Sequence, residues 1–181
     1  RGAITASQID IASGGNATAA FTQFCQSRLT GIRRFVFDVD CELELPPDNA
    51  GFQLASGTIV LEADNADEIS HGKDATRTIG MPNMHPVRAA ARGLTKRRNL
   101  FDATYFRARG LRFQHDAEVL ESDFTGNGNA GNVFSVTDGS GFWAEKCKFD
   151  FISGDAVELN DHSFWRLTKC WFGKQYFSVY L

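Results

Sequence analysis

The chain has 181 residues, of which 43% are hydrophobic and 23% are charged, and its formal net charge is −3 at pH 7. A chain of this length can bury a sizeable core, and the charge balance gives no reason to expect a nucleic-acid partner. No apolar run approaches the roughly 20 residues that cross a membrane, so we expect no membrane insertion. Sixteen Phe and seventeen Gly favour stacked strands with tight corners, and hence one β-rich domain.

The first predicted element is a helix that follows a lead-in, residues 1–15. From Ala17 to Leu29 the apolar residues recur at intervals of three and four, which is the spacing of one helical face: Phe21, Phe24, Cys25 and Leu29. Asn16 or Thr18 can cap the N-terminus of this helix. Residues 16–18 also form a glycosylation sequon, but helix capping is the interpretation that we adopt.

Short runs with a β pattern follow the helix and are separated by residues typical of turns. The expected strands are Phe35–Val39, Cys41–Leu45, Phe52–Leu54 and Gly57–Leu61. The helix and these strands make up the segment 16–70.

The next segment, residues 71–99, carries seven basic residues between His71 and Asn99 and a single acid, Asp74. Pro86 favours a short helix through residues 88–92, which would present its basic side chains to solvent or to a partner. One interpretation is a solvated insertion with a helical turn. The other is a surface that faces an acidic polysaccharide or a neighbouring subunit. Nucleic acid is disfavoured because no aromatic residues alternate with the basic ones.

The strongest pattern lies in residues 100–181, where two stretches match when one is shifted by 23 residues, which we call the repeat shift. Phe134 then falls on Val157, and Phe149 falls on Phe172. A period of this length, with apolar residues matching apolar residues, predicts a solenoid in which each repeat covers the next.

Within each repeat every second residue is apolar, as in Lys146–Phe149 and Lys169–Phe172, which predicts strands with one buried face. Residues 121–124 fit the same position one repeat earlier if 25 residues separate the two, with the extra length in residues 126–132. Stacking the three strands predicts two inward columns: Ser122, Cys147 and Cys170 in one, and Phe124, Phe149 and Phe172 in the other. The cysteines are therefore expected to be core thiols and not a disulfide or metal ligands.

Residues 126–131 satisfy the dinucleotide-binding pattern G-x-G-x-x-G. That site requires a helix after the glycines, whereas a strand pattern, Val133–Val136, follows here. We interpret the run as a corner between repeats. The four His residues are too scattered for ligand spacing, so we expect no metal site and no cofactor.

The order of the early elements resembles a known family. The helix that begins at Asn16, the strand Phe35–Val39, and then Phe52–Leu54 and Thr58–Leu61 resemble the start of pectate-lyase-like right-handed β-helices, and more narrowly of bacteriophage tailspikes. The resemblance covers residues 16–61 and the repeats of residues 100–181.

This resemblance implies an all-β fold, a right-handed parallel β-helix solenoid with a short N-terminal capping α-helix. It implies a phage tailspike in the virion tail that acts at the outside of the bacterial cell, where it binds and depolymerises a surface polysaccharide (capsule or O-antigen) during host attachment. The implied partners are that polysaccharide, further copies in a homotrimer, and other virion tail proteins. We expect the chain to be a fragment of a longer protein, truncated at its C-terminus.

Glycosidic cleavage by the common route uses two carboxyl groups, about 5 to 5.5 Å apart for retention or about 6.5 to 9.5 Å apart for inversion. Asp138 and Asp161 are equivalent residues of adjacent repeats, and Asp155 and Glu158 precede Asp161 in the same repeat. These four are the candidate catalytic residues of a glycoside hydrolase, because stacked carboxylates raise one pKa, as a general acid requires. The alternative is that the aspartates are ordinary turn residues.

The outward positions of the repeated strands suggest a substrate-binding surface. Trp171 has no apolar neighbour that explains an outward position, so it is a candidate platform for a sugar ring, and Lys148 and Lys169 beside it favour an acidic sugar. Arg166 completes this set, and with Lys169 it is the candidate base of a lyase. The alternative is a solvated charge ladder. Trp143 is left out because its orientation within the repeat is ambiguous.

Two other functions fit the same sequence. One is a non-catalytic receptor-binding or structural tail fibre module, in which the basic segment 71–99 docks another virion protein. The other is a cellular pectate-lyase-like enzyme, which is disfavoured because no calcium-dependent lyase motif is recognisable.

Overall fold

A computed structural model describes residues 3–9, 11–26, 34–44, 52–53, 59–82, 98–114, 131–159, 164–173 and 175–180. Most of these residues belong to parallel strands, and the described part contains one α-helix, α1 (Thr18–Gln26).

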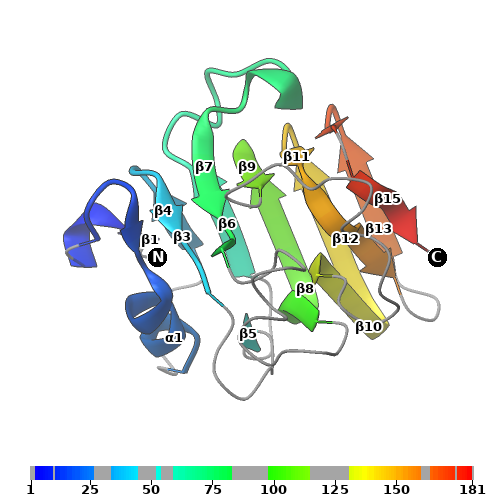
Figure 1. The fold of residues 1–181 in the computed structure, drawn as a ribbon, viewed down its shortest axis with the longest axis horizontal. Coiled ribbons are helices and arrows are strands. Elements are labelled where there is room, and N and C mark those ends of the chain that lie inside the picture. Colours follow the sequence, from blue (N-terminus) through cyan, green and yellow to red (C-terminus); the bar gives the residue numbers. More distant parts are fainter. Residues whose placement is uncertain are drawn as a thin grey trace.

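The strands and two short 3-10 turns follow one another along the chain (Figure 1). The N-terminal half contains β1 (Ala3–Thr5), η1 (Ser7–Ile9), β2 (Gly15–Asn16), β3 (Arg34–Phe37), β4 (Cys41–Glu42), β5 (Phe52–Gln53), β6 (Ile59–Ala63), η2 (Gly72–Asp74) and β7 (Arg77–Gly80). The C-terminal half contains β8 (Arg98–Arg109), β9 (Leu111–Gln114), β10 (Gly131–Glu145), β11 (Lys148–Asp150), β12 (Ile152–Leu159), β13 (Phe164–Thr168), β14 (Trp171–Phe172) and β15 (Gln175–Tyr180).

The strands form two sheets, and every pairing between described strands is parallel. The nine-stranded sheet has the order β1-β3-β6-β8-β10-β12-β15, with β5 paired to β8 and β13 paired to β10. The six-stranded sheet has the order β2-β4-β7-β9-β11-β14. Within each sheet, strands therefore lie side by side in the order in which they occur in the sequence (Figure 1). The prediction of a mostly β, parallel fold is confirmed.

The repeat shift found in the sequence is the pairing register of three strand pairs. The paired residues are Phe134 with Val157, Trp143 with Arg166, and Lys148 with Trp171. Because parallel strands lie about 4.8 Å apart, residues separated by this shift are direct neighbours. The register predicted for the last third of the chain is confirmed in these strands.

The strand that precedes β11 in the six-stranded sheet differs from the prediction. The neighbours of β11 are β14 and β9, so Phe113 and not Phe124 stacks on Phe149. The rings of Phe113, Phe149 and Phe172 form one column, with centroids 5.4 and 5.2 Å apart. Residues 121–124 lie outside the described residues. The prediction failed here because Leu111–Gln114 shows the same alternation, at a spacing that differs from the repeat shift.

Each of the last three passages from the nine-stranded to the six-stranded sheet turns on one residue with a left-handed backbone. These residues are Gly110, Lys146 and Lys169, with φ of 65°, 55° and 54°. We call two successive strands of the chain, one in each sheet, a level. Hydrogen bonds also join adjacent levels at these corners: Gly110 N–H donates to Glu145 O (3.0 Å), and Lys146 N–H donates to Thr168 O (2.8 Å). The hydrogen bonding between adjacent levels therefore continues from the strands into the corner.

The equivalent passage between β6 and β7 is much longer, and we call it the strap (residues 64–76). The strap lies along the single-residue corners of later levels. A Cβ on Gly110 would lie 2.9 Å from Ala66 Cα, and Lys146 Nζ donates to Ala66 O (3.2 Å). The strap thus links the strand levels sideways, across the direction of the strands.

The expected basic insertion, residues 71–99, is in part regular structure. Its first residues belong to the strap, and Arg77–Gly80 is strand β7, which pairs with β4 and β9. Arg77 is neutralised by Asp64, at 2.9 Å from its guanidinium. Residues 83–97, with the expected helix after Pro86, lie outside the described residues.

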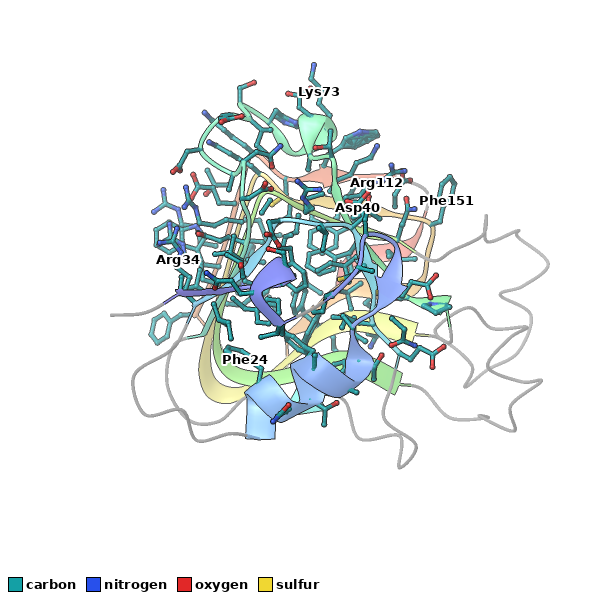
Figure 2. The ribbon with its side chains drawn as sticks, turned by 90° about the vertical axis from the view of Figure 1, so that its left-hand side faces the viewer. Phe24, Arg34, Asp40, Lys73, Arg112 and Phe151 are labelled. Carbon is teal, nitrogen blue, oxygen red and sulfur yellow. The ribbon has the colours of Figure 1, made fainter. Side chains whose placement is uncertain are left out.

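The helix α1 lies at the end of the molecule where β1 is found, and Figure 2 looks onto this end. Thr18 N–H donates to Asn16 Oδ1 (2.9 Å), so Asn16 acts at the helix start as predicted. Phe21 is fully buried, and its ring contacts those of Phe35, Phe37, Phe52 and Phe101. The helix therefore covers the phenylalanines of the first strands. The described helix runs to Gln26, and residues 27–29 of the predicted helix lie outside the described residues.

The predicted early strands are present as β3, β4, β5 and β6, and the predicted strand residues 45, 54, 57 and 58 lie outside the described residues. No helix in the described part of the chain is long and apolar enough to cross a membrane.

Candidate functional site

The candidate residues Lys148 and Trp171 lie next to each other on the outer face of the six-stranded sheet. They are register partners in β11 and β14, and Lys148 Nζ lies 5.9 Å from the centre of the Trp171 ring. Since Phe149 and Phe172 stack inward, the residues that precede them face outward. The outward orientation expected for Trp171 follows from this alternation, and a flat ring beside an ammonium group is a geometry that favours a bound sugar or anion.

The charge of Lys148 is locally balanced. Asp150 Oδ2 lies 3.4 Å from Lys148 Nζ and 3.3 Å from the guanidinium of Arg112, the residue beside Lys148 in β9. Asp150 therefore holds two cations of this face. Lys148 therefore offers a ligand the alkyl part of its side chain and its contact with Trp171, and not an unpaired charge.

Arg166 lies on the other sheet, where it stacks on Trp143. Arg107, Trp143 and Arg166 are register partners in β8, β10 and β13. The guanidinium carbons of Arg107 and Arg166 lie 4.3 and 5.0 Å from the Trp143 ring centre. The indole is therefore held between two cations. Sequence reasoning left Trp143 out, although the repeat shift, which places it beside Arg166, was a sufficient signal.

Lys169 is the corner residue between β13 and β14, so it lies between Arg166 and Trp171 along the chain. Its side chain is exposed. We call the surface formed by Trp143, Lys148, Arg166, Lys169 and Trp171 the β13–β14 surface. It contains all four predicted substrate-binding residues, and it spans the corner between the two sheets.

Two cations of the β13–β14 surface differ from the other cations of the protein. Most described basic side chains pair with carboxylates: Arg34, Arg77, Arg107, Arg109, Arg112 and Lys148. Within the described residues, Arg166 and Lys169 have no carboxylate partner, and Arg166 donates only to Thr168 Oγ1 (3.2 Å). The positive charge at this corner is therefore available to a ligand.

The candidate catalytic carboxylates are placed differently. Asp155 is only 1% exposed, and its N–H donates to Asn132 Oδ1 (2.8 Å). The same amide donates through Nδ2 to Glu158 Oε2 (3.0 Å). The structure thus joins Asp155 and Glu158 through Asn132, in a place where Asp155 is closed to solvent. The side chain of Asp138, and all of Asp161, lie outside the described residues.

The chain was compared with protein-family models, with curated proteins and with solved structures. None of them matches. Within the described residues, no group of three His, Cys, Asp or Glu side chains is arranged to hold a metal ion. A function is therefore inferred from the β13–β14 surface itself.

The thiols beneath this surface provide a test of its packing. Cys147 and Cys170 are free, and they precede the register partners Lys148 and Trp171, so they occupy equivalent positions in adjacent levels. Burial raises the pKa of Cys147, whereas a hydrogen bond from the Cys147 side chain lowers the pKa of Cys170. Burial also raises the pKa of Cys41, to about 12.

We expect iodoacetamide at pH 8 to alkylate Cys170 before Cys147 and Cys41. A lower pKa gives a larger thiolate fraction at a given pH, and the thiolate is the nucleophile. Peptide mass spectrometry over a time course locates the label, and the denatured chain, in which all thiols react at similar rates, is the control. Labelling of Cys41 or Cys147 as fast as Cys170 in the folded protein would contradict this packing.

Proposed function

We propose that this chain is a polysaccharide-binding module of a bacteriophage tailspike, folded as a right-handed parallel β-helix with α1 as its N-terminal cap. The fold part of the proposal is supported by two parallel sheets whose strands follow the order of the sequence. It is further supported by the burial of Phe21 of the helix against the first strands. In this proposal the module belongs to a homotrimer in the virion tail, contacts other tail proteins, and acts at the outside of the bacterial cell.

The observation that carries the proposed binding is the pair of cations without a carboxylate partner among the described residues, Arg166 and Lys169, on the surface that also carries the ring of Trp171. An indole ring offers a flat apolar face to a sugar ring, and a guanidinium or ammonium group recognises a carboxylate substituent. A surface with both groups suits an acidic polysaccharide, such as a capsule or O-antigen that contains uronic acid. Unpaired charge also accelerates the encounter with an anionic polymer.

The burial of Asp155 favours binding without cleavage at this place, because a polymer in solution does not reach a side chain that is 1% exposed. We therefore put binding first and treat depolymerisation as an outcome to be measured. New reducing ends alone would show hydrolysis, ultraviolet absorbance from an unsaturated product would show a lyase reaction, and neither signal would identify a non-catalytic module.

The test is a binding measurement with the whole chain on purified capsular polysaccharides, with and without uronic acid. We expect an acidic polymer to bind, and Trp171→Ala and Lys169→Gln each to weaken that binding roughly tenfold, which corresponds to about 1.4 kcal/mol. Arg34→Gln is the matched control, because Arg34 lies on β3 and is paired with Glu62. Unchanged affinity in both surface variants, or no binding to any acidic polymer, would overturn the proposal.

A further inference from the structure

The strap (residues 64–76) reaches the corner that carries Lys169. Gly72 N–H donates to Lys169 O (2.7 Å). A Cβ on Gly72 would lie 2.2 Å from Cys147 O and 2.8 Å from Trp171 N, so the backbone at this point approaches two strand levels more closely than any other residue would allow. A segment from the first half of the sequence is thus seated directly on the backbone of the β13–β14 surface.

The turn η2 is held in one arrangement by its own hydrogen bonds. Lys73 N–H donates to His71 Nδ1 (3.2 Å), and Asp74 N–H donates to His71 O (2.9 Å). Asp74 Oδ2 accepts from Ser70 Oγ (3.4 Å), so this carboxylate is hydrogen-bonded within the turn while it keeps its negative charge. The backbone of Lys73 is therefore fixed next to Gly72.

Lys73 is an exposed cation with no carboxylate partner among the described residues, as are Arg166 and Lys169. Its side chain points away from the body of the molecule, at the top of the view in Figure 2. Because Gly72 is hydrogen-bonded to Lys169, the backbones of two unpaired lysines are neighbours. An anionic polymer that reaches both side chains contacts two positive charges.

We propose that Lys73 is a further binding residue of the β13–β14 surface, which the strap carries to the corner, and that Lys73, Lys169 and Arg166 together bind the anionic groups of a polymer. Gly72 is the positioning residue, because it allows the contact between the strap and the corner. This inference rests on the proposed function, which it deepens by adding a second segment of the chain to the site. It also gives a role to Lys73, the first lysine of the segment 71–99.

The experiment uses dextran sulfate as a polyanion and uncharged dextran as its counterpart, with the whole chain and at several salt concentrations. We expect dextran sulfate to bind and dextran not to bind. Lys73→Gln weakens the binding three- to tenfold, as Lys169→Gln does, and lowers its salt dependence, because one fewer counterion is displaced. Arg34→Gln, whose cation is paired with Glu62, leaves the affinity within about twofold.

The outcomes separate this inference from the proposed function. If an acidic capsular polymer binds through Trp171 but Lys73→Gln binds both polymers like the unaltered chain, the role of Lys73 is wrong and the proposed function stands. If Lys73→Gln weakens binding to dextran sulfate while no bacterial polysaccharide binds, the anion-binding corner stands and the proposed function is wrong. If the unaltered chain does not bind dextran sulfate, the proposal that Lys73, Lys169 and Arg166 bind anionic groups is wrong. Lys73 is exposed, so the variant is expected to fold, and its thermal midpoint checks this.

Discussion

Phe149→Ala is expected to lower the free energy of unfolding by about 3 to 5 kcal/mol, the cost of removing a buried phenyl ring. Phe149 is fully buried, and its ring lies between those of Phe113 and Phe172. The truncation opens a cavity in the column that connects three strand levels, so neither neighbour keeps its contact. Urea unfolding followed by fluorescence measures the change.

Phe164→Ala is the matched control for this loss. Phe164 is 82% exposed on β13, and its removal should change the free energy of unfolding by less than about 0.5 kcal/mol. Equal effects of the two substitutions would mean that Phe149 does not occupy the interior between the sheets.

Gly72→Ala is expected to lower the free energy of unfolding by about 3 kcal/mol, because the added methyl group meets backbone atoms that cannot rotate away. It would lie 2.2 Å from Cys147 O, and relief requires the strap to leave the corner. The same movement displaces Lys73, so binding of a polyanion should weaken together with stability. Thermal and urea unfolding measure the first effect, and the dextran sulfate assay measures the second.

Gly80→Ala is the control for the loss of a buried glycine. The nearest atom to a Cβ at this position is Glu42 Cγ at 3.4 Å, a normal contact with a flexible side chain. Stability should stay the same or rise by up to about 1 kcal/mol, because alanine restricts the unfolded chain. A large loss at Gly80 with none at Gly72 would show that the strap is not seated on the corner.

The sequence was most informative where a pattern repeats at short range. The alternation around Phe149 and Phe172 predicts both the strands and their register, because a slip by one residue would expose every buried ring. The same repeat shift brings Trp171 to Lys148 and Arg166 to Trp143. The four predicted substrate-binding residues therefore fall on β11, β13, β14 and the corner between the last two strands.

Prediction was poorer where the spacing between levels changes. Phe113 was missed because Phe124 lies 25 residues before Phe149, close to the repeat shift, whereas Phe113 lies 36 residues before it, and β11 pairs with β9. Residues 71–76 of the strap were assigned to an insertion. The strap contributes only backbone atoms to its hydrogen bonds with Lys146 and Lys169, and no side-chain pattern reveals such bonds.

The candidate catalytic residues show a different limit. A carboxylate pattern such as that of Asp155 and Glu158 is the same in a turn, in an active site and in a buried hydrogen-bond cluster. In the structure Asp155 is buried, and Asn132 accepts from the main-chain N–H of Asp155 and donates to Glu158 Oε2. The sequence contained no signal for either.

At the left-handed corner residue Lys169, the side chain that suits ligand binding is unfavourable for stability. A side chain in this backbone region costs free energy that glycine does not incur, and asparagine incurs less of it. Lys146 offsets its cost through the bond to Ala66 O, but Lys169, at φ 54°, has no such bond and no carboxylate partner within the described residues. Laboratory evolution that selects only for thermal stability should therefore replace Lys169 by Gly or Asn early. The more stable protein should bind acidic polysaccharides less tightly.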